Sequence, residues 1–404
     1  MQSPALYLKE EAKQRLDAGF LAAFGKLPSR YFSAPGRTEI GGNHTDHQRG
    51  RVLAAAVNLD TLAAVAPNAL GQIRILSQGY PMCCIELSHL EVVVSERNTT
   101  AALVRGVAAR FRQLGYPVEG FDAYCTSTVL PGSGLSSSAA FEVLMGTVIN
   151  GLFCQGGVSA PQIAMIGQYA ENVYFGKPCG LMDQTASAVG GLVAIDFAQA
   201  ENPQIRSVPF DLAGCGYALC ILDSGADHAD LTDEYAAVPA EMKAVAAQLG
   251  AEVLSQVSEQ AFFRALPRLR ESCGDRAVLR SLHFLRENQR VVEQVQALEK
   301  GDFERFLQLV GCSGRSSWMY LQNVIPAGNR SQQAMAVTLA LCEELLQGQG
   351  AFRVHGGGFA GTVQAFVPMD LLDGFCRGAE AVLGAGACHV LSVRPQGGTE
   401  LQVP

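Results

Sequence analysis

A glycine-rich turn that runs directly into a serine-headed helix is the segment of this chain best suited to chemistry. Residues 130–142 read Leu-Pro-Gly-Ser-Gly-Leu-Ser-Ser-Ser-Ala-Ala-Phe-Glu. Glycines at 132 and 134 let the backbone approach an anion closely, and the unpaired N–H groups at a helix start attract negative charge. The three serines add hydroxyls for phosphate oxygens or a metal ion. The segment predicts a phosphate-binding loop, with a Gly/Ser turn and a serine N-cap as the plain structural alternative.

The loop resembles a known nucleotide-binding motif, but not a Walker A loop, since no Gly-Lys-Ser/Thr closes it, nor a Rossmann fingerprint. Residues 131–140 resemble the nucleotide loop of the GHMP small-molecule kinases. Residues 35–47, Pro-Gly-Arg-Thr-Glu-Ile-Gly-Gly-Asn-His-Thr-Asp-His, resemble the galactokinase signature, and residues 356–362, Gly-Gly-Gly-Phe-Ala-Gly-Thr, the family's third motif. By this resemblance the chain is identified as a member of the galactokinase family, which implies a sugar-1-kinase that makes α-D-galactose 1-phosphate from D-galactose and ATP.

The resemblance implies two catalytic residues, Arg37 and Asp183. Asp183 lies in residues 178–184, a turn directly after the helix that carries Glu171. Its implied role is to accept the proton of the sugar C1 hydroxyl, or to favour loss of that proton electrostatically. The Arg37 guanidinium is implied to stabilise the Asp183 carboxylate and the charge on the migrating phosphoryl group. In isolation, a turn aspartate and a surface ion pair would be the commoner explanations.

The implied cofactors are ATP as a substrate and Mg²⁺. Mg²⁺ takes hard oxygen ligands and often keeps several waters, so Ser138 and Glu171 are sufficient beside the phosphates. Without the resemblance, Glu171 is a solvated residue on an amphipathic helix and residues 356–358 form a plain turn. The nucleotide contacts that the resemblance implies are Pro131, Gly132, Ser133, Gly134, Leu135, Ser136, Ser137, Ser138, Ala139, Gly357 and Gly358.

The implied sugar contacts come from separate parts of the chain. They are Asn43, His44, Asp46, Gly180 and Tyr235. A carboxylate such as Asp46 suits this role because it accepts two hydroxyl protons in a directional way. The run 44–47, His-Thr-Asp-His, also suggests a metal cluster, but adjacent loop residues rarely supply three convergent ligands.

Several positions depart from the family pattern. Galactokinases usually carry Gly-Glu-His-Thr-Asp-Tyr where residues 42–47 read Gly-Asn-His-Thr-Asp-His, so a glutamate that engages the C6 hydroxyl is Asn43 here. Thr38 and Glu39 replace the usual aliphatic-asparagine pair, and Ser133 and Ala360 each replace a glycine. Loss of a carboxylate beside C6 removes an acceptor and a negative charge, which would suit a sugar with a C6 carboxylate. A galacturonokinase, which residues 46–48 also resemble, is therefore the nearest enzymatic alternative.

Two further alternatives belong to other classes. The family includes non-catalytic galactose and ATP sensors, but those are altered around the serine-alanine stretch, which is uninterrupted here from Ser136 to Ala140. Isoprenoid and homoserine kinases share the superfamily but lack the signature of residues 37–47. Both alternatives therefore fit the chain less well than a sugar kinase.

The elements that must position these residues can be anticipated from periodicity. A helix is expected from about Ser136, where apolar residues recur every three or four positions, and another from Ser159, whose capping box with Gln162 precedes a stop at Gly176. Residues 233–346 are mainly helical. Strands are expected at 52–66, 73–76, 121–129, 217–222, 362–367 and 389–393.

These elements indicate an α/β N-terminal domain and an α+β C-terminal domain. We expect the first, with the sugar signature and phosphate loop, over residues 1–200, and the second, with the third glycine motif, over residues 201–404. The boundary is expected between residues 185 and 215. The resemblance implies the two-domain GHMP kinase architecture, with the active site in the cleft between the domains.

Composition limits the partners. The chain has 404 residues, and 48% of them are hydrophobic. Its net charge of −8 provides no electrostatic attraction to nucleic acid or to anionic lipid. No apolar stretch has the length of a membrane span, and the N-terminus has no apolar signal-peptide core. Twelve cysteines without a C-x-x-C spacing indicate reduced, mostly buried thiols rather than disulfides or a zinc site. We expect a cytoplasmic monomer whose partners are a sugar and ATP-Mg, with no nucleic acid and no membrane.

Overall fold

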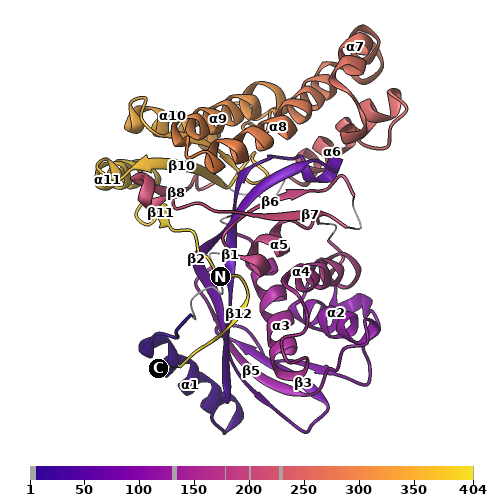
Figure 1. Ribbon diagram of the computed structural model, residues 1–404, viewed down its shortest axis with the longest axis vertical. Coiled ribbons are helices and arrows are strands. Elements are labelled where there is room, and N and C mark those ends of the chain that lie inside the picture. The colour runs from indigo at the N-terminus through magenta and orange to yellow at the C-terminus, as the bar shows by residue number, and fades with distance from the viewer. Residues whose placement is uncertain (1–5, 130–133, 178, 200–201, 227–230, 404) are drawn as a thin grey trace.

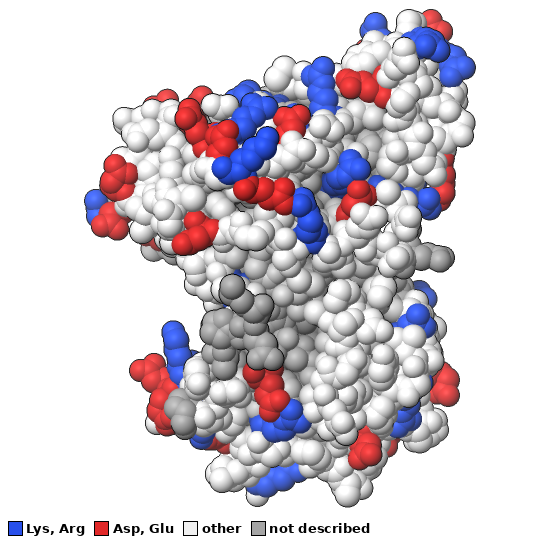
Figure 2. Space-filling view, in the orientation of Figure 1, with Lys and Arg blue, Asp and Glu red and all other residues white. Residues whose placement is uncertain are grey.

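The computed structural model describes residues 6–129, 134–177, 179–199, 202–226 and 231–403. Two lobes are visible in Figure 1: helices α2 to α5 pack on one side of the lower sheet, and α8 and α9 lie above the upper one. The space-filling view in Figure 2 narrows between the lobes, and over the upper helices Lys and Arg lie among Asp and Glu. Both lobes carry mixed helices and strands, as predicted.

The lower lobe is built on an eight-stranded sheet in the order β12-β1-β2-β5-β3-β4, with β6 paired to β2 and β7 to β6. All its pairs are antiparallel except the parallel pair β3 and β5. Strand β2 pairs with β1 along one edge; along its other edge its first residues pair with β6 and its last residues with β5. The strands are β1 Arg30–Gly41, β2 Arg51–Pro67, β3 Gln72–Ser77, β4 Cys83–Glu86, β5 Phe121–Ser127, β6 Leu192–Asp196, β7 Gln204–Val208 and β12 Thr399–Leu401.

The helices of this lobe follow the predicted pattern in most places. Val143, Leu144 and Val148 of α3 are fully buried, which confirms the helix expected from about Ser136. The capping box of Ser159 with Gln162 starts α4 as predicted, but the helix continues from Ala170 in the wider π form before it ends at Gly176. The helices are α1 Glu10–Phe24, α2 Thr100–Gln113, α3 Ser137–Phe153, α4 Ala160–Tyr169, the π-helical turn Ala170–Phe175 and α5 Met182–Val189.

The upper lobe has an antiparallel four-stranded sheet in the order β11-β8-β10-β9. Alternate residues of β8 serve its two faces: Leu219 and Ile221 pack toward α8 and α9, and Cys220 and Leu222 toward α10 and α11. Parts of β1 and β2 join the first of these cores, so the two lobes share apolar packing. The strands are β8 Tyr217–Asp223, β9 Ala351–His355, β10 Thr362–Pro368 and β11 Cys388–Leu391.

The predicted helical stretch of residues 233–346 is confirmed as five helices and a short π-helical turn. Proline lies inside α6 and α7, at Pro239 and Pro267, without ending either helix. The helices of the upper lobe are α6 Thr232–Gln248, α7 Glu259–Cys273, α8 Asp275–Glu299, α9 Phe303–Ser316, the π-helical turn Ser317–Leu321, α10 Ala334–Leu346 and α11 Leu372–Leu383.

The sheets and the halves of the sequence do not coincide completely. Strand β7 and the C-terminal strand β12 lie beyond residue 200, yet both complete the lower sheet. The C-terminal strand reaches it by pairing with β1, for example Tyr31 opposite Leu401. The domain boundary between residues 200 and 201 therefore stays a prediction. The sheet pairing shows that the chain returns to the lower lobe at β12. In the described ranges, no helix combines the length and apolar character that crossing a bilayer requires.

An aromatic cluster holds α9 against the upper sheet, and it allows a test of this packing. Phe306 of α9 meets Phe366 of β10 edge to face, with 5.4 Å between ring centroids, and is 1% exposed. We expect Phe306→Ala to lower the free energy of unfolding by ~3–5 kcal/mol, because it opens a cavity between helix and sheet. Urea denaturation followed by circular dichroism measures this, with Phe263→Ala, at a residue that is 42% exposed, as the matched control. Equal small losses in both variants would contradict the packing.

Candidate active site

An irregularity in β1 directs Arg37 toward the start of α3. The pairing of β1 with β2 shifts register between Pro35 and Arg37, so the Arg37 amide leaves the ladder. It donates instead to the carbonyl oxygen of Leu135, at 3.0 Å, just before α3. On the other side, the Ser187 hydroxyl of α5 donates to the carbonyl oxygen of Pro35 at 2.7 Å. The bulge is thus bonded to both helices that carry predicted site residues.

Arg37 and Asp183 form a bidentate ion pair. Nε of Arg37 lies 2.7 Å from Oδ1 of Asp183, and Nη2 lies 2.5 Å from Oδ2. The third guanidinium nitrogen, Nη1, donates to the carbonyl oxygen of Gly134. The Ser136 hydroxyl also donates to Asp183, with Oγ 2.7 Å from Oδ2. Three segments far apart in the sequence therefore meet around one carboxylate, as the sequence predicted. Asp183 itself is the second residue of α5, not part of a turn, so the expected turn was wrong.

The environment of Asp183 keeps it ionised. Burial raises the pKa of its carboxyl, but the charge of Arg37 and the hydrogen bonds from Arg37 and Ser136 outweigh burial, so the pKa lies below its ordinary value. The carboxylate is therefore an acceptor at neutral pH, held in place by two donors.

The start of α3 has the features of an anion site. Ser136 adopts a left-handed conformation, with φ +57°, just before the helix begins at Ser137. A Cβ at Gly134, where φ is +70°, would lie 3.1 Å from Nδ1 of His355, so glycine allows the close approach of the last residue of β9. The predicted contacts Pro131, Gly132 and Ser133 lie outside the described residues. The described part of the loop therefore presents its helix N-terminus beside the Arg37–Asp183 pair.

A cavity of about 250 Å³ adjoins this helix start on the side of α2 and β5. Ser137, Ser138 and Phe141 of α3 form one wall. Thr100 and Leu103 of α2 lie among the residues opposite. Its mixed hydroxyl and apolar lining, next to a helix N-terminus, suits a ligand with an anionic end and a flat apolar part.

Two buried carboxylates lie near one another behind the loop. Gln184 Nε2 of α5 donates to Oε2 of Glu171 and to Oε2 of Glu142, each at 2.9 Å. Glu142 lies one helical turn after Ser138, so the two side chains share a face of α3. Burial and repulsion by Glu171 raise the pKa of Glu142 well above its ordinary value, and its Oε1 is buried without a partner among the described residues. This oxygen-rich set, with Ser138 beside it, fits the donors that Mg²⁺ prefers.

Most of the predicted sugar contacts gather around the third glycine motif and Asp183. His44 Nε2 donates to the carbonyl oxygen of Gly357 at 3.0 Å, and the Tyr235 hydroxyl donates to the carbonyl oxygen of Gly358 at 2.9 Å. Gly180 lies against Asp46, because a Cβ at position 180 would overlap the Asp46 carboxylate. Burial raises the pKa of Asp46, and the nearby carboxylates Glu39 and Asp183 add to this shift. These contacts place Asp46 and Asp183 on the same small region.

Asn43 differs from the other predicted contacts because its side chain is completely buried. Its Nδ2 donates to Oε1 of Glu39, at 3.1 Å, and to the carbonyl oxygen of Gly356, at 2.6 Å. Its Oδ1 accepts from Ser317 and Asn323 at 3.3 and 3.0 Å. With these four partners, the amide is engaged by protein groups in this arrangement, which does not support the expected direct contact with a sugar C6 group.

The sequence analysis missed several residues that hold this region together. Glu39 is paired with the fully buried Arg353, and His355 bonds Thr38 and Thr362 through its two nitrogens. A signal was present for Glu39, since positions 39 and 43 depart from the family pattern in opposite directions, Asn to Glu and Glu to Asn. Read as a pair, the two departures indicate side chains in contact.

Comparison with known proteins supports this arrangement. Residues 18–67 match the model of the galactokinase galactose-binding signature, and residues 102–191 match the N-terminal domain of the GHMP kinases. The chain is 32% identical to the galactokinase of Streptomyces coelicolor over 384 residues, which cover 94% of this chain and 96% of that one. The chain belongs to the galactokinase family.

Solved structures agree with a galactokinase fold. The galactokinase of Lactococcus lactis, solved in complex with galactose, superposes with a TM-score of 0.81 at 23% identity and covers 96% of this chain and 99% of its own. The mevalonate kinase of Methanococcus jannaschii superposes with a TM-score of 0.64 at 12% identity, over 90% and 98% of the two chains. The chain thus has the two-domain GHMP kinase architecture.

Removal of the Arg37 charge tests the electrostatics of the pair. In Arg37→Gln, burial still disfavours the Asp183 carboxylate while the opposing charge is gone, so we expect the pKa of Asp183 to rise above that of the wild type. Carbon-13 NMR titration of aspartate-labelled protein measures the shift, with the Asp183 signal identified by its loss in Asp183→Asn. Arg74→Gln, which breaks a remote contact to Asp122 of 2.7 Å, is the matched control. An unchanged or lower Asp183 pKa in Arg37→Gln would contradict this account.

Proposed function

We propose that this protein transfers the γ-phosphoryl group of ATP to the C1 hydroxyl of D-galactose and releases α-D-galactose 1-phosphate and ADP. The observation that carries this proposal is the contact of Asp183 with both Arg37 and Ser136, beside Asp46 and at the N-terminus of α3. An acceptor carboxylate, a cation and a helix N-terminus are the groups that phosphoryl transfer to an alcohol needs in one place.

Asp183 and Arg37 are the proposed catalytic residues. The Asp183 carboxylate accepts the C1 hydroxyl proton, or favours its loss electrostatically, and its low pKa keeps it ready for either role. Arg37 holds that carboxylate with two hydrogen bonds and offers its charge to the phosphoryl oxygens as transfer proceeds. The ion pair thus orients the acceptor and offsets developing negative charge.

The nucleotide is proposed to bind across the start of α3. The triphosphate lies along residues 131–139, where the helix amides donate to anionic oxygens, and Gly357 and Gly358 approach from the other lobe. The cavity lined by Ser137 and Phe141 receives the base. Contacts from Pro131, Gly132 and Ser133 remain part of this proposal on the strength of the sequence motif.

Mg²⁺ is proposed to bind at Ser138 and Glu171. Its bound charge would neutralise the phosphate oxygens. The unpartnered buried oxygen of Glu142, close behind Glu171, supports a positive charge in this place. Glu142 and Gln184 orient Glu171 from behind, since Gln184 donates to both carboxylates.

The sugar is proposed to lie against His44, Asp46, Gly180 and Tyr235, with C1 toward Asp183. Asp46 accepts hydroxyl protons, and His44 is held in place by its bond to Gly357. The backbone of Gly180 adjoins Asp46, and the absence of a side chain at position 180 lets the Asp46 carboxylate lie there. Asn43 acts indirectly, by tying β1 to Gly356 and Asn323.

Galactose is favoured over galacturonate because the carboxylate that position 43 lacks is present nearby, at position 39. Glu39 and Asn43 are in contact, so the usual asparagine and glutamate of positions 39 and 43 have exchanged places. The region keeps one carboxylate, one amide and the paired cation of Arg353. This set has no net positive charge that would attract a sugar with a C6 carboxylate. No observation on the described residues favours a sensor or an isoprenoid or homoserine kinase, and a cytoplasmic, monomeric state stays a prediction of the sequence.

A sugar panel with a catalytic variant tests the proposed reaction. We expect ADP release from ATP-Mg with galactose, and much less with galacturonate, N-acetylgalactosamine, arabinose or glucose. Asp183→Asn should lower kcat by ~10³-fold, because it removes the proton acceptor, while calorimetry finds galactose binding largely intact. Asp196→Asn, in the Arg51–Asp196 pair between β2 and β6, is the matched control. Near-normal turnover in Asp183→Asn would exclude its catalytic role, and preference for galacturonate would exclude the proposed substrate.

A double-mutant cycle tests the exchanged pair. Glu39→Asn leaves Arg353 buried without its carboxylate, and Asn43→Glu places two carboxylates in contact, so each should lower the free energy of unfolding by ~3–5 kcal/mol. The combined variant restores one amide and one carboxylate. We expect it to recover most of the stability and of kcat/KM for galactose. Glu96→Asn, which breaks a separate pair with Arg105, should combine additively with Asn43→Glu. If the losses of unfolding free energy from Glu39→Asn and Asn43→Glu also added up in the combined variant, the contact between the two residues would be contradicted.

A further inference from the structure

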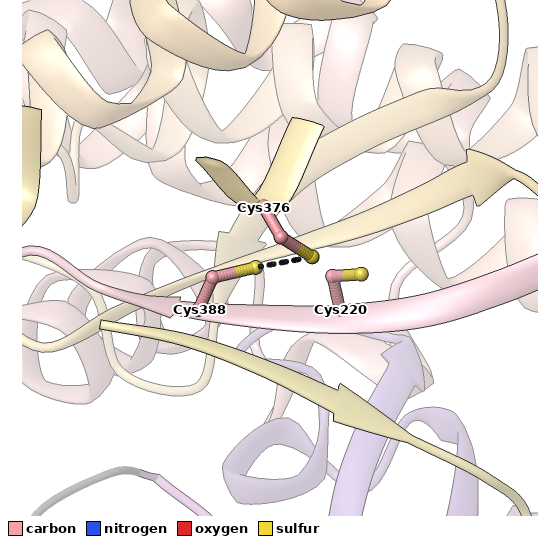
Figure 3. Close-up of side chains that lie close together, drawn as sticks. All are labelled: Cys220, Cys376 and Cys388. Atoms are coloured by element: carbon pink, nitrogen blue, oxygen red, sulfur yellow. Dashed lines mark hydrogen bonds between the residues drawn. The ribbon is translucent and has the colours of Figure 1, made fainter. Parts of the chain in front are cut away.

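Three cysteine side chains converge in the upper lobe, away from the proposed active site. Cys220 lies on β8, Cys376 on α11 and Cys388 at the start of β11; Figure 3 shows the sulfur atoms of Cys376 and Cys388 facing each other, with Cys220 beside them. The three Sγ atoms all lie within 4.8 Å of one another, and those of Cys376 and Cys388 are 3.6 Å apart. Positions 220, 376 and 388 are too widely spaced for any motif to have revealed the cluster.

The fold brings these thiols together for identifiable reasons. In the pairing of β8 with β11, Cys388 lies opposite Leu222 and Val390 opposite Cys220, so both cysteines are on one face of the sheet. Helix α11 packs on that face through Phe375 and Ala379. Cys376 follows Phe375 directly and reaches the same place from the helix. A sheet and a helix thus hold the three sulfurs independently of any ligand.

We propose that Cys220, Cys376 and Cys388 form a binding site for a soft, thiophilic cation of the Cu(I) class. A metal–thiolate bond of ~2.3 Å places three sulfurs around one ion ~4 Å apart in a trigonal arrangement. The separations between the three Sγ atoms, from 3.6 Å to at most 4.8 Å, need only side-chain rotation to reach that geometry. Thiolate sulfur is the donor that selects Cu(I) over harder ions.

The number of ligands distinguishes the candidate ions. Zn²⁺ in structural protein sites takes four ligands, and among the described His, Cys, Asp and Glu residues only these three cysteines group together. Cu(I) has no such requirement and accepts a purely sulfur environment. Binding involves no oxidation: the ion leaves its carrier as Cu(I), and each thiol that coordinates it releases one proton to solvent.

The cluster already contains a sulfur–sulfur hydrogen bond, which Cys388 donates to Cys376. A soft cation would replace thiol protons of this kind. Bound, it would join β8, β11 and α11 and stabilise the upper lobe.

Competition for Cu(I) tests the site directly. Under anaerobic, reducing conditions, the full-length protein is titrated with Cu(I) supplied as its bicinchoninate complex, and loss of that complex's colour reports transfer. We expect one equivalent of Cu(I) per chain and a rise in melting temperature. Cys220→Ala, Cys376→Ser and Cys388→Ser should each weaken binding by more than ~100-fold, since even loss of an outer-shell partner costs ~10–100-fold. Cys215→Ser, at an exposed cysteine outside the cluster, should bind like the wild type.

The design separates loss of ligands from loss of folding. Alanine at the fully buried position 220 avoids a buried hydroxyl, and the melting temperature of each metal-free variant shows whether it is folded. Absence of Cu(I) uptake by the wild type, or equal uptake by the triple variant, would overturn the proposal. Tighter binding of Zn²⁺ than of Cu(I) would overturn the assignment of the ion.

Discussion

The structure of the candidate site depends on the ion pair between Arg37 and Asp183. A carboxylate in this place loses hydration, and it stays ionised only because a guanidinium and a hydroxyl face it. The same guanidinium bonds the carbonyl oxygen of Gly134, so one side chain fixes the relation between β1, α5 and the approach to α3. The bulge that frees the Arg37 amide for Leu135 is part of this arrangement. The bulge interrupts the pairing of β1 with β2, and hydrogen bonds to Leu135, just before α3, and from Ser187 of α5 compensate for this.

The second lobe contributes through close backbone approach and through the ion pair of Arg353 with Glu39. Gly357 and Gly358 accept hydrogen bonds from His44 and Tyr235, and Gly134 leaves room for His355. Leu219 and Ile221 pack into a core that also contains parts of β1 and β2. Shared packing and these contacts bring His355 and Thr362, on either side of the glycine motif, close to Gly134 before α3.

Specificity illustrates why single positions can mislead. Asn43 alone indicates a lost carboxylate and hence a sugar acid, but its amide contacts Glu39, which is paired with Arg353. The carboxylate is therefore at position 39, hydrogen-bonded to Asn43, rather than at position 43. The polarity around position 43 is set by Asn43, Glu39 and Arg353 together, not by Asn43 alone.

The sequence by itself determined what local order encodes: the periodicity of α3, the capping box at Ser159, the strands β2 and β5, and motifs in which neighbouring residues act together. Its motifs also indicated the family and predicted most of the residues that lie around Asp183. Only the tertiary structure decided the long β1, the place of Asp183 on a helix, the burial of Asn43 and the meeting of three cysteines. Those features depend on which strands pair and which faces pack. Such contacts join residues tens to hundreds of positions apart, where the sequence carries no local signal.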